Sequence, residues 1–107
     1  KPQRILSMNL CTDQLLLHLA EPERIVSLTY LSHEPGATSP RFASVIRDKP
    51  RNRALAEEAL ALKPDLILAG AYSARTTTAL LRRLGYTVHV FEPENSLADM
   101  FANIRRL

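Results

Sequence analysis

The hydrophobic positions alternate along the chain between short continuous runs and stripes with helical spacing. The continuous runs predict four buried strands, at residues 4–8, 24–28, 65–69 and 87–91. Each run is bounded by polar or turn-forming residues, as expected where a strand enters and leaves a sheet. The strands are short and mainly apolar, which favours a sheet that is covered on both faces.

Stripes with helical spacing separate these strands. The first predicted helix follows residues 4–8 and has Thr12 or Asp13 as its N-cap, while Pro22 lies just past its end. Its apolar stripe consists of Leu15, Leu16 and Leu19. Residues 29–53 are rich in loops, with one or two helical turns expected over 40–48.

Three further helices are predicted in the second half of the chain. One runs from about residue 53 to 62 and is ended by Pro64, and the next covers 76–85 with Gly85 as its C-terminal cap. The last begins after Ser96, and its apolar stripe consists of Leu97, Met100, Phe101, Ile104 and Leu107. No stop signal follows this stripe, so we expect the chain to be part of a longer protein.

The order of these elements predicts the fold class. Strands that alternate with helices form parallel sheets with right-handed crossovers. We therefore expect an α/β fold, a three-layer α-β-α lobe with a short, mostly parallel four-stranded sheet. In such sheets ligands bind beyond the carboxyl ends of the strands, so the loops at that edge are the candidate site.

Composition narrows the possible functions. The chain has 107 residues, of which 46% are hydrophobic, enough for one domain with its own core. A net charge of +3 without a basic stripe interleaved with aromatics gives no reason to expect nucleic acid binding. The apolar runs are shorter than the ~20 residues of a membrane span, so no membrane insertion is expected. The first residues lack the apolar core of a signal peptide, so an exported form must already have lost its signal.

Motifs for nucleotides and metals are absent from the sequence. The three glycines, Gly36, Gly70 and Gly85, lie too far apart to form a phosphate-binding loop. The three histidines, His18, His33 and His89, do not pair with a cysteine or another histidine at a ligand spacing. We therefore expect no metal site and no cofactor.

Catalysis by a nucleophile is the main alternative. Ser73, His33 and Asp13 are the residue types of a catalytic triad, but no nucleophile elbow surrounds a serine. Cys11 lies at a strand-to-helix turn, either as a nucleophile or as a small apolar residue packed under the loop. Either nucleophile would suit a flavodoxin-like or other α/β enzyme domain of the cytoplasm.

The loops after the first three predicted strands carry a mixture of residues suited to binding. Asn9 follows the first strand, Tyr30 and His33 the second, and Tyr72 and Arg75 the third. Tyrosines, a histidine and an arginine suit a ligand that has flat apolar surface and polar groups. No acid and base pair accompanies them, so we assign no catalytic residues.

Three segments of the chain carry a family resemblance. "PQRILSMNLCTDQLLLHLAEPERIVSLTYLS", "LAEEALALKPDLILAG" and "LLRRLGYTVHVFEPENSLADMFANIRRL" together cover nearly all of it. The pattern E-x-x-L-x-L-K-P-D-L-I-L is the most specific part. The chain resembles the amino-terminal lobe of the substrate-binding proteins of bacterial ABC importers, in the subfamily that serves cobalamin, ferric siderophores and haem.

The resemblance implies two α/β lobes joined by a long helix, with the ligand held between them in the periplasm. Residues 1–107 would be the first lobe and would end at the start of the interlobe helix, with the second lobe outside this chain. The protein would deliver its ligand to the transmembrane permease of the importer and would not be an enzyme. The ligand itself would carry the iron or cobalt.

The resemblance also implies roles for particular residues. It points to the strand-end loops for ligand binding and adds an arginine six residues before the glutamate of the specific pattern, with Arg53 as a nearby substitute. The implied ligand-binding residues are Asn9, Tyr30, His33, Arg51, Tyr72 and Arg75. Glu57, or the adjacent Glu58, would dock on an arginine of the permease. Tryptophan is absent, which leaves the ligand open between a ferric siderophore, haem and cobalamin, with His33 as an axial ligand in the case of haem.

Overall fold

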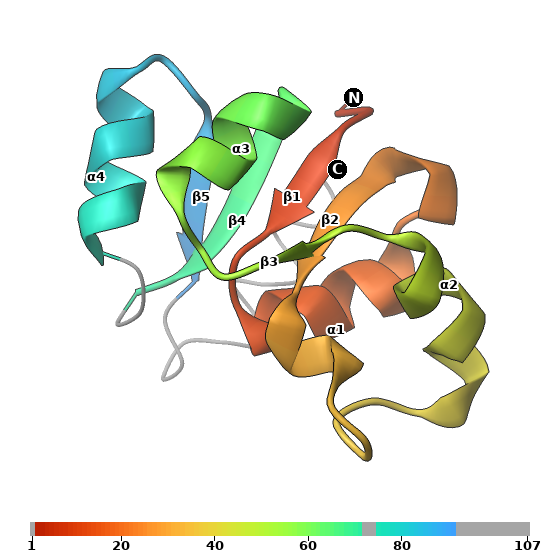
Figure 1. Cartoon of the computed structure of the whole chain (residues 1–107). Helices are drawn as coiled ribbons and strands as arrows, with labels where there is room; N and C mark the ends of the chain where they lie inside the picture. Colours follow the sequence, from red (N-terminus) through yellow and green to blue (C-terminus); the bar gives the residue numbers. More distant parts are fainter. Residues whose placement is uncertain (1, 72–74, 92–107) are drawn as a thin grey trace.

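Five parallel strands form one sheet in the computed structural model, which describes residues 2–71 and 75–91. The strands are β1 (Ile5–Ser7), β2 (Ile25–Thr29), β3 (Arg51–Asn52), β4 (Leu66–Gly70) and β5 (Val88–Phe91). Their order in the sheet is β3-β2-β1-β4-β5, and each neighbouring pair is parallel (Figure 1). The predicted α/β class is confirmed.

The expected number of four strands is one too low. The additional strand, β3, contains two residues, Arg51 and Asn52, which pair with Leu28 and Thr29 of β2. Neither residue of β3 is apolar, so no hydrophobic run marks the strand in the sequence. Its position beside β2 is nevertheless important, because it brings the segment after Pro50 to the carboxyl edge of the sheet.

Four helices and three 3-10 turns connect the strands within the described residues. The helices are α1 (Leu10–Leu19), α2 (Ala43–Asp48), α3 (Ala56–Leu62) and α4 (Arg75–Arg83). The 3-10 turns are η1 (Pro22–Arg24), η2 (Tyr30–His33) and η3 (Pro40–Phe42). The expected turns over 40–48 are confirmed as η3 and α2, whereas the helix expected at the end of the chain lies outside the described residues.

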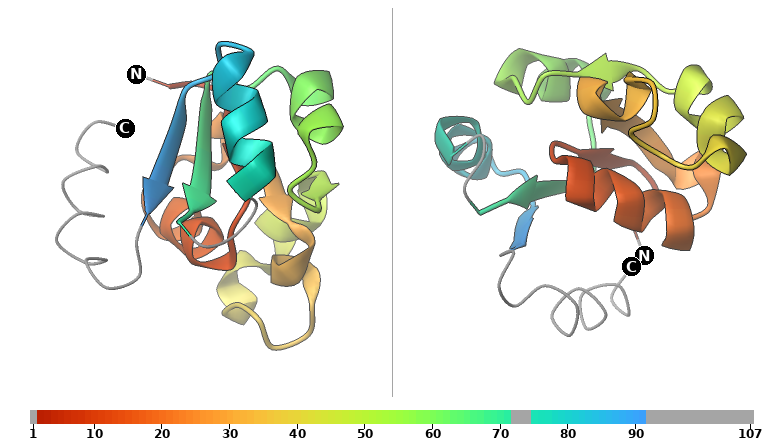
Figure 2. Two further views of the ribbon diagram at one scale, coloured as in Figure 1. Left: turned by 90° about the vertical axis from the view of Figure 1, so that its left-hand side faces the viewer. Right: turned by 90° about the horizontal axis from the view of Figure 1, so that it is seen from below.

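Helices cover both faces of the sheet, as the short apolar strands predict. Figure 2 shows α1 on one side of the sheet and α3 and α4 on the other. Successive residues of β4 divide between the two layers: Leu66 and Leu68 pack with α1, whereas Ile67 and Ala69 pack with α3 and α4. This alternation follows from the two-residue period of a strand, and it gives the lobe two apolar cores.

The ends of two helices differ from the expectation. The N-cap of α1 is Asn9, because its side chain accepts hydrogen bonds from the backbone of the first turn, so the prediction of Thr12 or Asp13 is wrong. Leu19 is 48% exposed and Leu17 is buried in its place. Helix α3 begins at Ala56, later than expected, whereas the predicted C-terminal cap of α4 is confirmed by the positive φ of Gly85.

Candidate functional site

Three of the predicted ligand residues lie together where β2 and β3 reach the carboxyl edge of the sheet. Tyr30 and His33 are the first and last residues of η2, and Arg51 lies on β3, which pairs with β2. The guanidinium carbon of Arg53 is 4.9 Å from the centroid of the Tyr30 ring. This group of a tyrosine, a histidine and two arginines presents an aromatic face next to positive charge, which we call the η2–β3 cluster.

His33 is the half-buried member of the η2–β3 cluster. Its Nε2 atom is buried and has no hydrogen-bond partner in the described part of the chain. Burial lowers the pKa of His33, and the positive charge of Arg51 lowers this pKa further. The imidazole is therefore neutral near pH 7, a state that suits contact with an apolar ligand or with a metal-bearing one.

Two further predicted ligand residues, Asn9 and Arg75, lie elsewhere on the edge. Asn9 caps α1, where its Oδ1 accepts from the backbone N–H groups of Cys11 at 2.8 Å and Thr12 at 3.3 Å. Arg75 begins α4 and follows β4, which is two strands from β2 in the sheet, roughly 10 Å away. Tyr72 lies outside the described residues.

A buried carboxylate holds η2 in place. Asp13 is completely buried in α1, and its carboxylate accepts hydrogen bonds from the backbone N–H of Thr29 at 3.2 and 3.1 Å. The hydroxyl groups of Thr29 and Ser32 donate to Asp13 Oδ2 at 2.6 and 2.5 Å. Burial raises the pKa of Asp13 above its ordinary value, although these donors act in the opposite direction. Asp13 thus fixes both ends of the segment that carries Tyr30 and His33.

The raised pKa of Asp13 predicts a pH dependence of stability. A carboxyl group with a raised pKa in the folded state stabilises the fold most in acid, and this contribution is lost as the pH rises through the folded-state pKa. The variant Asp13→Asn cannot titrate at this position. We therefore expect the difference in unfolding free energy between wild type and Asp13→Asn to shrink as the pH rises above the ordinary value of 3.8. Urea unfolding of both proteins at a series of pH values measures this difference. A difference that grows with pH contradicts a raised pKa of Asp13.

A second buried group joins the three strands behind the η2–β3 cluster. The side-chain amide of Asn52 donates to the carbonyl of Ser7 in β1 at 2.8 Å and to the hydroxyl of Ser27 in β2 at 2.9 Å. Asn52 Oδ1 accepts from the backbone N–H of Ala54 at 3.0 Å, and Ser27 donates to the carbonyl of Pro50 at 2.7 Å. The ends of β1, β2 and β3 are therefore held in one arrangement by side-chain hydrogen bonds.

The described residues do not form the nucleophile and acid arrangement of the catalytic alternative. Cys11 is exposed, so the expectation that it packs under the loop as a small apolar residue is wrong. The bonds from Thr29 and Ser32 occupy the carboxylate of Asp13, the proposed acid of a triad. Ser73 lies outside the described residues. Within residues 2–71 and 75–91, no group of three histidine, cysteine or acidic side chains is placed to hold a metal ion.

None of the helices in the described segments combines the length and the apolar character needed to cross a membrane.

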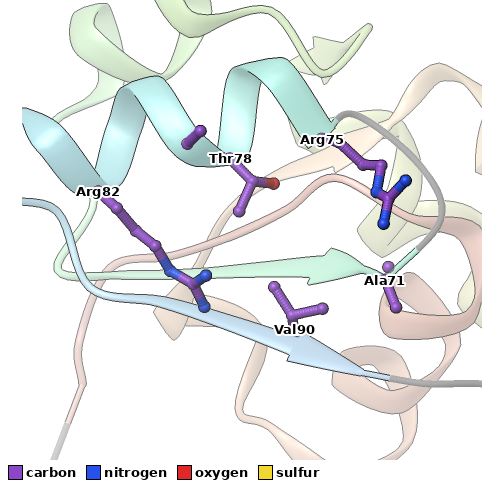
Figure 3. A pocket seen from close by; sticks show the side chains of 7 residues that line it. Ala71, Arg75, Thr78, Arg82 and Val90 are labelled. Carbon is purple, nitrogen blue, oxygen red and sulfur yellow. The ribbon is translucent and has the colours of Figure 1, made fainter.

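A pocket of about 240 Å³ lies between α4 and the strands β4 and β5. Arg75, Thr78 and Arg82 of α4 line one side of it, and Ala71 and Val90 line the other (Figure 3). Arg75 was predicted as a ligand residue, but the contributions of Thr78 and Arg82 were not. Their spacing from Arg75, at i+3 and i+7, places all three on one face of the helix, and this was the available sequence signal.

The two glutamates of α3 differ in their surroundings. Glu58 Oε1 accepts from the backbone N–H groups of Arg53 at 2.8 Å and Leu55 at 3.1 Å, so it caps the helix. Glu57 is exposed in the same first turn and forms no ion pair within the described residues. The arrangement leaves the Glu57 carboxylate available to a partner.

Comparison with solved structures gives close matches in fold. A possible iron-binding, periplasmic solute-binding protein from Staphylococcus epidermidis is 28% identical, with a TM-score of 0.67, covering 86% of this chain and 35% of that protein. The periplasmic vitamin B12 binding protein BtuF of Vibrio cholerae is 25% identical, with a TM-score of 0.64. The match covers 83% of this chain and 34% of that protein. A periplasmic heme binding protein from Pseudomonas aeruginosa is 21% identical, with a TM-score of 0.64. The match covers 86% of this chain and 32% of that protein.

These matches define the extent of the similarity. The chain spans about a third of the length of these structures. No protein-family model matches the chain, and comparison with curated proteins gives no match either. The structural neighbours are periplasmic proteins that bind haem, vitamin B12 or iron, and they are binding proteins rather than enzymes. The resemblance inferred from the sequence is confirmed.

Proposed function

We propose that this chain is the amino-terminal lobe of a periplasmic substrate-binding protein that captures an iron chelate or a corrinoid for an ABC importer. The observation that carries the proposal is the match of nearly the whole chain to one third of periplasmic haem-, vitamin B12- and iron-binding proteins. The expected family pattern in the sequence points to the same subfamily. A flavodoxin-like enzyme of the cytoplasm lacks comparable support.

The η2–β3 cluster forms one wall of the proposed ligand site. Siderophores and haem combine flat apolar surface with negatively charged oxygen atoms. The Tyr30 ring provides apolar contact, while Arg51 and Arg53 provide planar donors for carboxylate oxygen atoms. The neutral imidazole of His33 lies beside them, and its Nε2 atom has no hydrogen-bond partner within residues 2–71 and 75–91. Asn9, Tyr72 and Arg75 extend this wall along the edge of the sheet in the proposal.

Capture by such a site requires no chemical step. Affinity comes from burying the ligand between two walls that are already formed, and the second wall belongs to a second lobe outside this chain. The hydrogen bonds of Asp13 and Asn52 keep the first wall rigid before the ligand arrives. A preformed wall lowers the conformational entropy lost on binding. The metal enters with the ligand and is cargo rather than a cofactor.

The proposal is tested by titrating the complete protein with haem, cyanocobalamin and a ferric siderophore while recording absorbance. One of the three is expected to bind with a saturable spectral change. Arg51→Gln combined with Arg53→Gln should weaken that binding at least about tenfold, because two charge-assisted hydrogen bonds are lost. Arg47→Gln, an exposed arginine of α2 outside the cluster, is the matched control. Absence of binding by all three classes would overturn the proposal.

Glu57 is the proposed contact with the permease. Because Glu58 already caps α3, a carboxylate that must reach a partner is better supplied by Glu57. We expect Glu57→Gln to weaken docking on the permease about tenfold and to change the unfolding free energy by less than about 0.5 kcal/mol. Glu58→Ala should instead lower the unfolding free energy by about 1 kcal/mol because a cap is lost.

The measurements are binding to the reconstituted permease and urea unfolding of each variant. Docking that survives Glu57→Gln but fails with Glu58→Ala at a temperature where both variants are folded assigns the contact to Glu58. Chelate binding by Glu57→Gln remains at the wild-type level, because Glu57 does not belong to the η2–β3 cluster, whereas Glu58 accepts a hydrogen bond from the backbone of Arg53 within it.

A further inference from the structure

Helix α4 has polar residues where a helix packed on a sheet ordinarily has apolar ones. Arg75, Thr78 and Arg82 follow one another at i, i+3 and i+7, the spacing of a core-facing stripe. Figure 3 shows their side chains on the side of α4 that faces β4 and β5. Leu81 is completely buried and packs α4 on the sheet.

Thr78 is the most informative of the three. Its side chain is only 7% exposed, and its hydroxyl oxygen has no hydrogen-bond partner in the described part of the chain. A buried hydroxyl without a partner is unfavourable, and such groups in native structures call for an explanation. The hydroxyl lies in the wall of the pocket, so a polar ligand bound there would supply the missing hydrogen bond.

The two arginines give the pocket its charge. Arg82 Nη2 donates to the carbonyl of Val88 at 2.9 Å, which fixes one guanidinium over β5 and leaves its other N–H groups for another acceptor. In Figure 3 the side chains of both arginines extend toward the N-terminal end of α4, so the two guanidinium groups remain apart along the pocket. Neither α4, β4 nor β5 contains an acidic residue, so this positive charge has no counterpart within these elements.

We propose that the pocket between α4 and β5 binds a small organic dicarboxylate, with Arg75 and Arg82 at its two ends and the Thr78 hydroxyl between them. The seven-residue separation of the arginines corresponds to about 10 Å of helix axis. A dicarboxylate can engage both guanidinium groups, whereas a monocarboxylate reaches one. The pocket shares Arg75 with the proposed chelate wall but contains no residue of the η2–β3 cluster, so dicarboxylate binding there does not require the proposed function.

The test is an NMR titration of the isotopically labelled chain with glutarate, using acetate at equal ionic strength as the comparison. Glutarate should produce saturable shifts of the Thr78 and Val90 amides and the Arg82 side chain, at least about tenfold tighter than acetate. Arg82→Gln should weaken glutarate binding about tenfold or more. Thr78→Val, which removes the hydroxyl and keeps the shape, should weaken it several-fold.

Arg83→Gln is the matched control, because Arg83 lies on the same helix, is exposed and does not line the pocket. It changes the net charge equally and should leave glutarate binding within about twofold. Thermal unfolding establishes whether each variant is folded. If Arg82→Gln does not fold, the glutarate affinity of Thr78→Val tests the proposed site. Shifts that do not saturate, equal binding of acetate, or equal weakening by Arg83→Gln would overturn the proposal. None of these outcomes affects the chelate titration, which is read from absorbance.

Discussion

The complete protein is expected to bind its chelate at least about a hundredfold more tightly than this chain does alone. The chain supplies one wall of the proposed site, so a ligand bound to it keeps much of its surface in water. Each tenfold loss in affinity corresponds to about 1.4 kcal/mol, and removing the contacts of an entire opposing wall exceeds twice that amount. Absorbance titrations of the two proteins with the same chelate measure the ratio.

The comparison requires that the separate chain be folded. Circular dichroism and cooperative thermal unfolding establish this, so that weak binding is not attributed to an unfolded chain. Equal affinities of the chain and the complete protein would contradict the proposed clamp between two lobes. The separate chain could also bind the chelate a hundredfold more weakly, with no further loss of affinity from Arg51→Gln and Arg53→Gln. That result would place the chelate contacts of the chain outside the η2–β3 cluster.

The sequence predicts the fold where burial governs the choice of residues. The apolar runs that became β1, β2, β4 and β5 are buried between two helical layers, so their composition is restricted to residues that tolerate that position. The strand β3 and the turn η2 were missed because hydrogen bonds to Asn52 and Asp13, rather than burial of apolar side chains, define them. Such bonds depend on partners far away in the sequence, and periodicity carries no information about them.

The same distinction applies to the candidate site. The sequence predicts which loops share the carboxyl edge, because parallel strands with helical connections bring those loops together. It does not predict that Tyr30 lies next to Arg53 while Arg75 lines the pocket between α4 and β5, since both depend on the strand order. The buried hydroxyl of Thr78, which has no partner among the described residues, likewise cannot be predicted until the packing of α4 is known. Side-chain neighbours across strands are therefore the part that required the structure.

Asn52 should be the most important polar side chain for the stability of the lobe. The variant Asn52→Ala removes the donor to Ser7 and Ser27 and the acceptor for the Ala54 N–H, and all of these bonds are at least partly buried. Buried groups left without partners cost about 1–3 kcal/mol each, so we expect the unfolding free energy to fall by about 3 kcal/mol. Urea unfolding measures the change. The exposed Ser44→Ala of α2, a control for loss of a polar side chain, should stay within about 0.5 kcal/mol.

A double-mutant cycle separates the network from the cavity that truncation leaves. If Asn52 and Ser27 act through the bond between them, Ser27→Ala should cost less in the Asn52→Ala background than in the wild type, by about 1 kcal/mol. Strict additivity would mean that the bond between Asn52 and Ser27 contributes nothing to stability and does not tie β3 to β2. Coupling would instead mean that the ends of β2 and β3 are fixed together. The wall that they carry would then be rigid because of side chains that never touch the ligand.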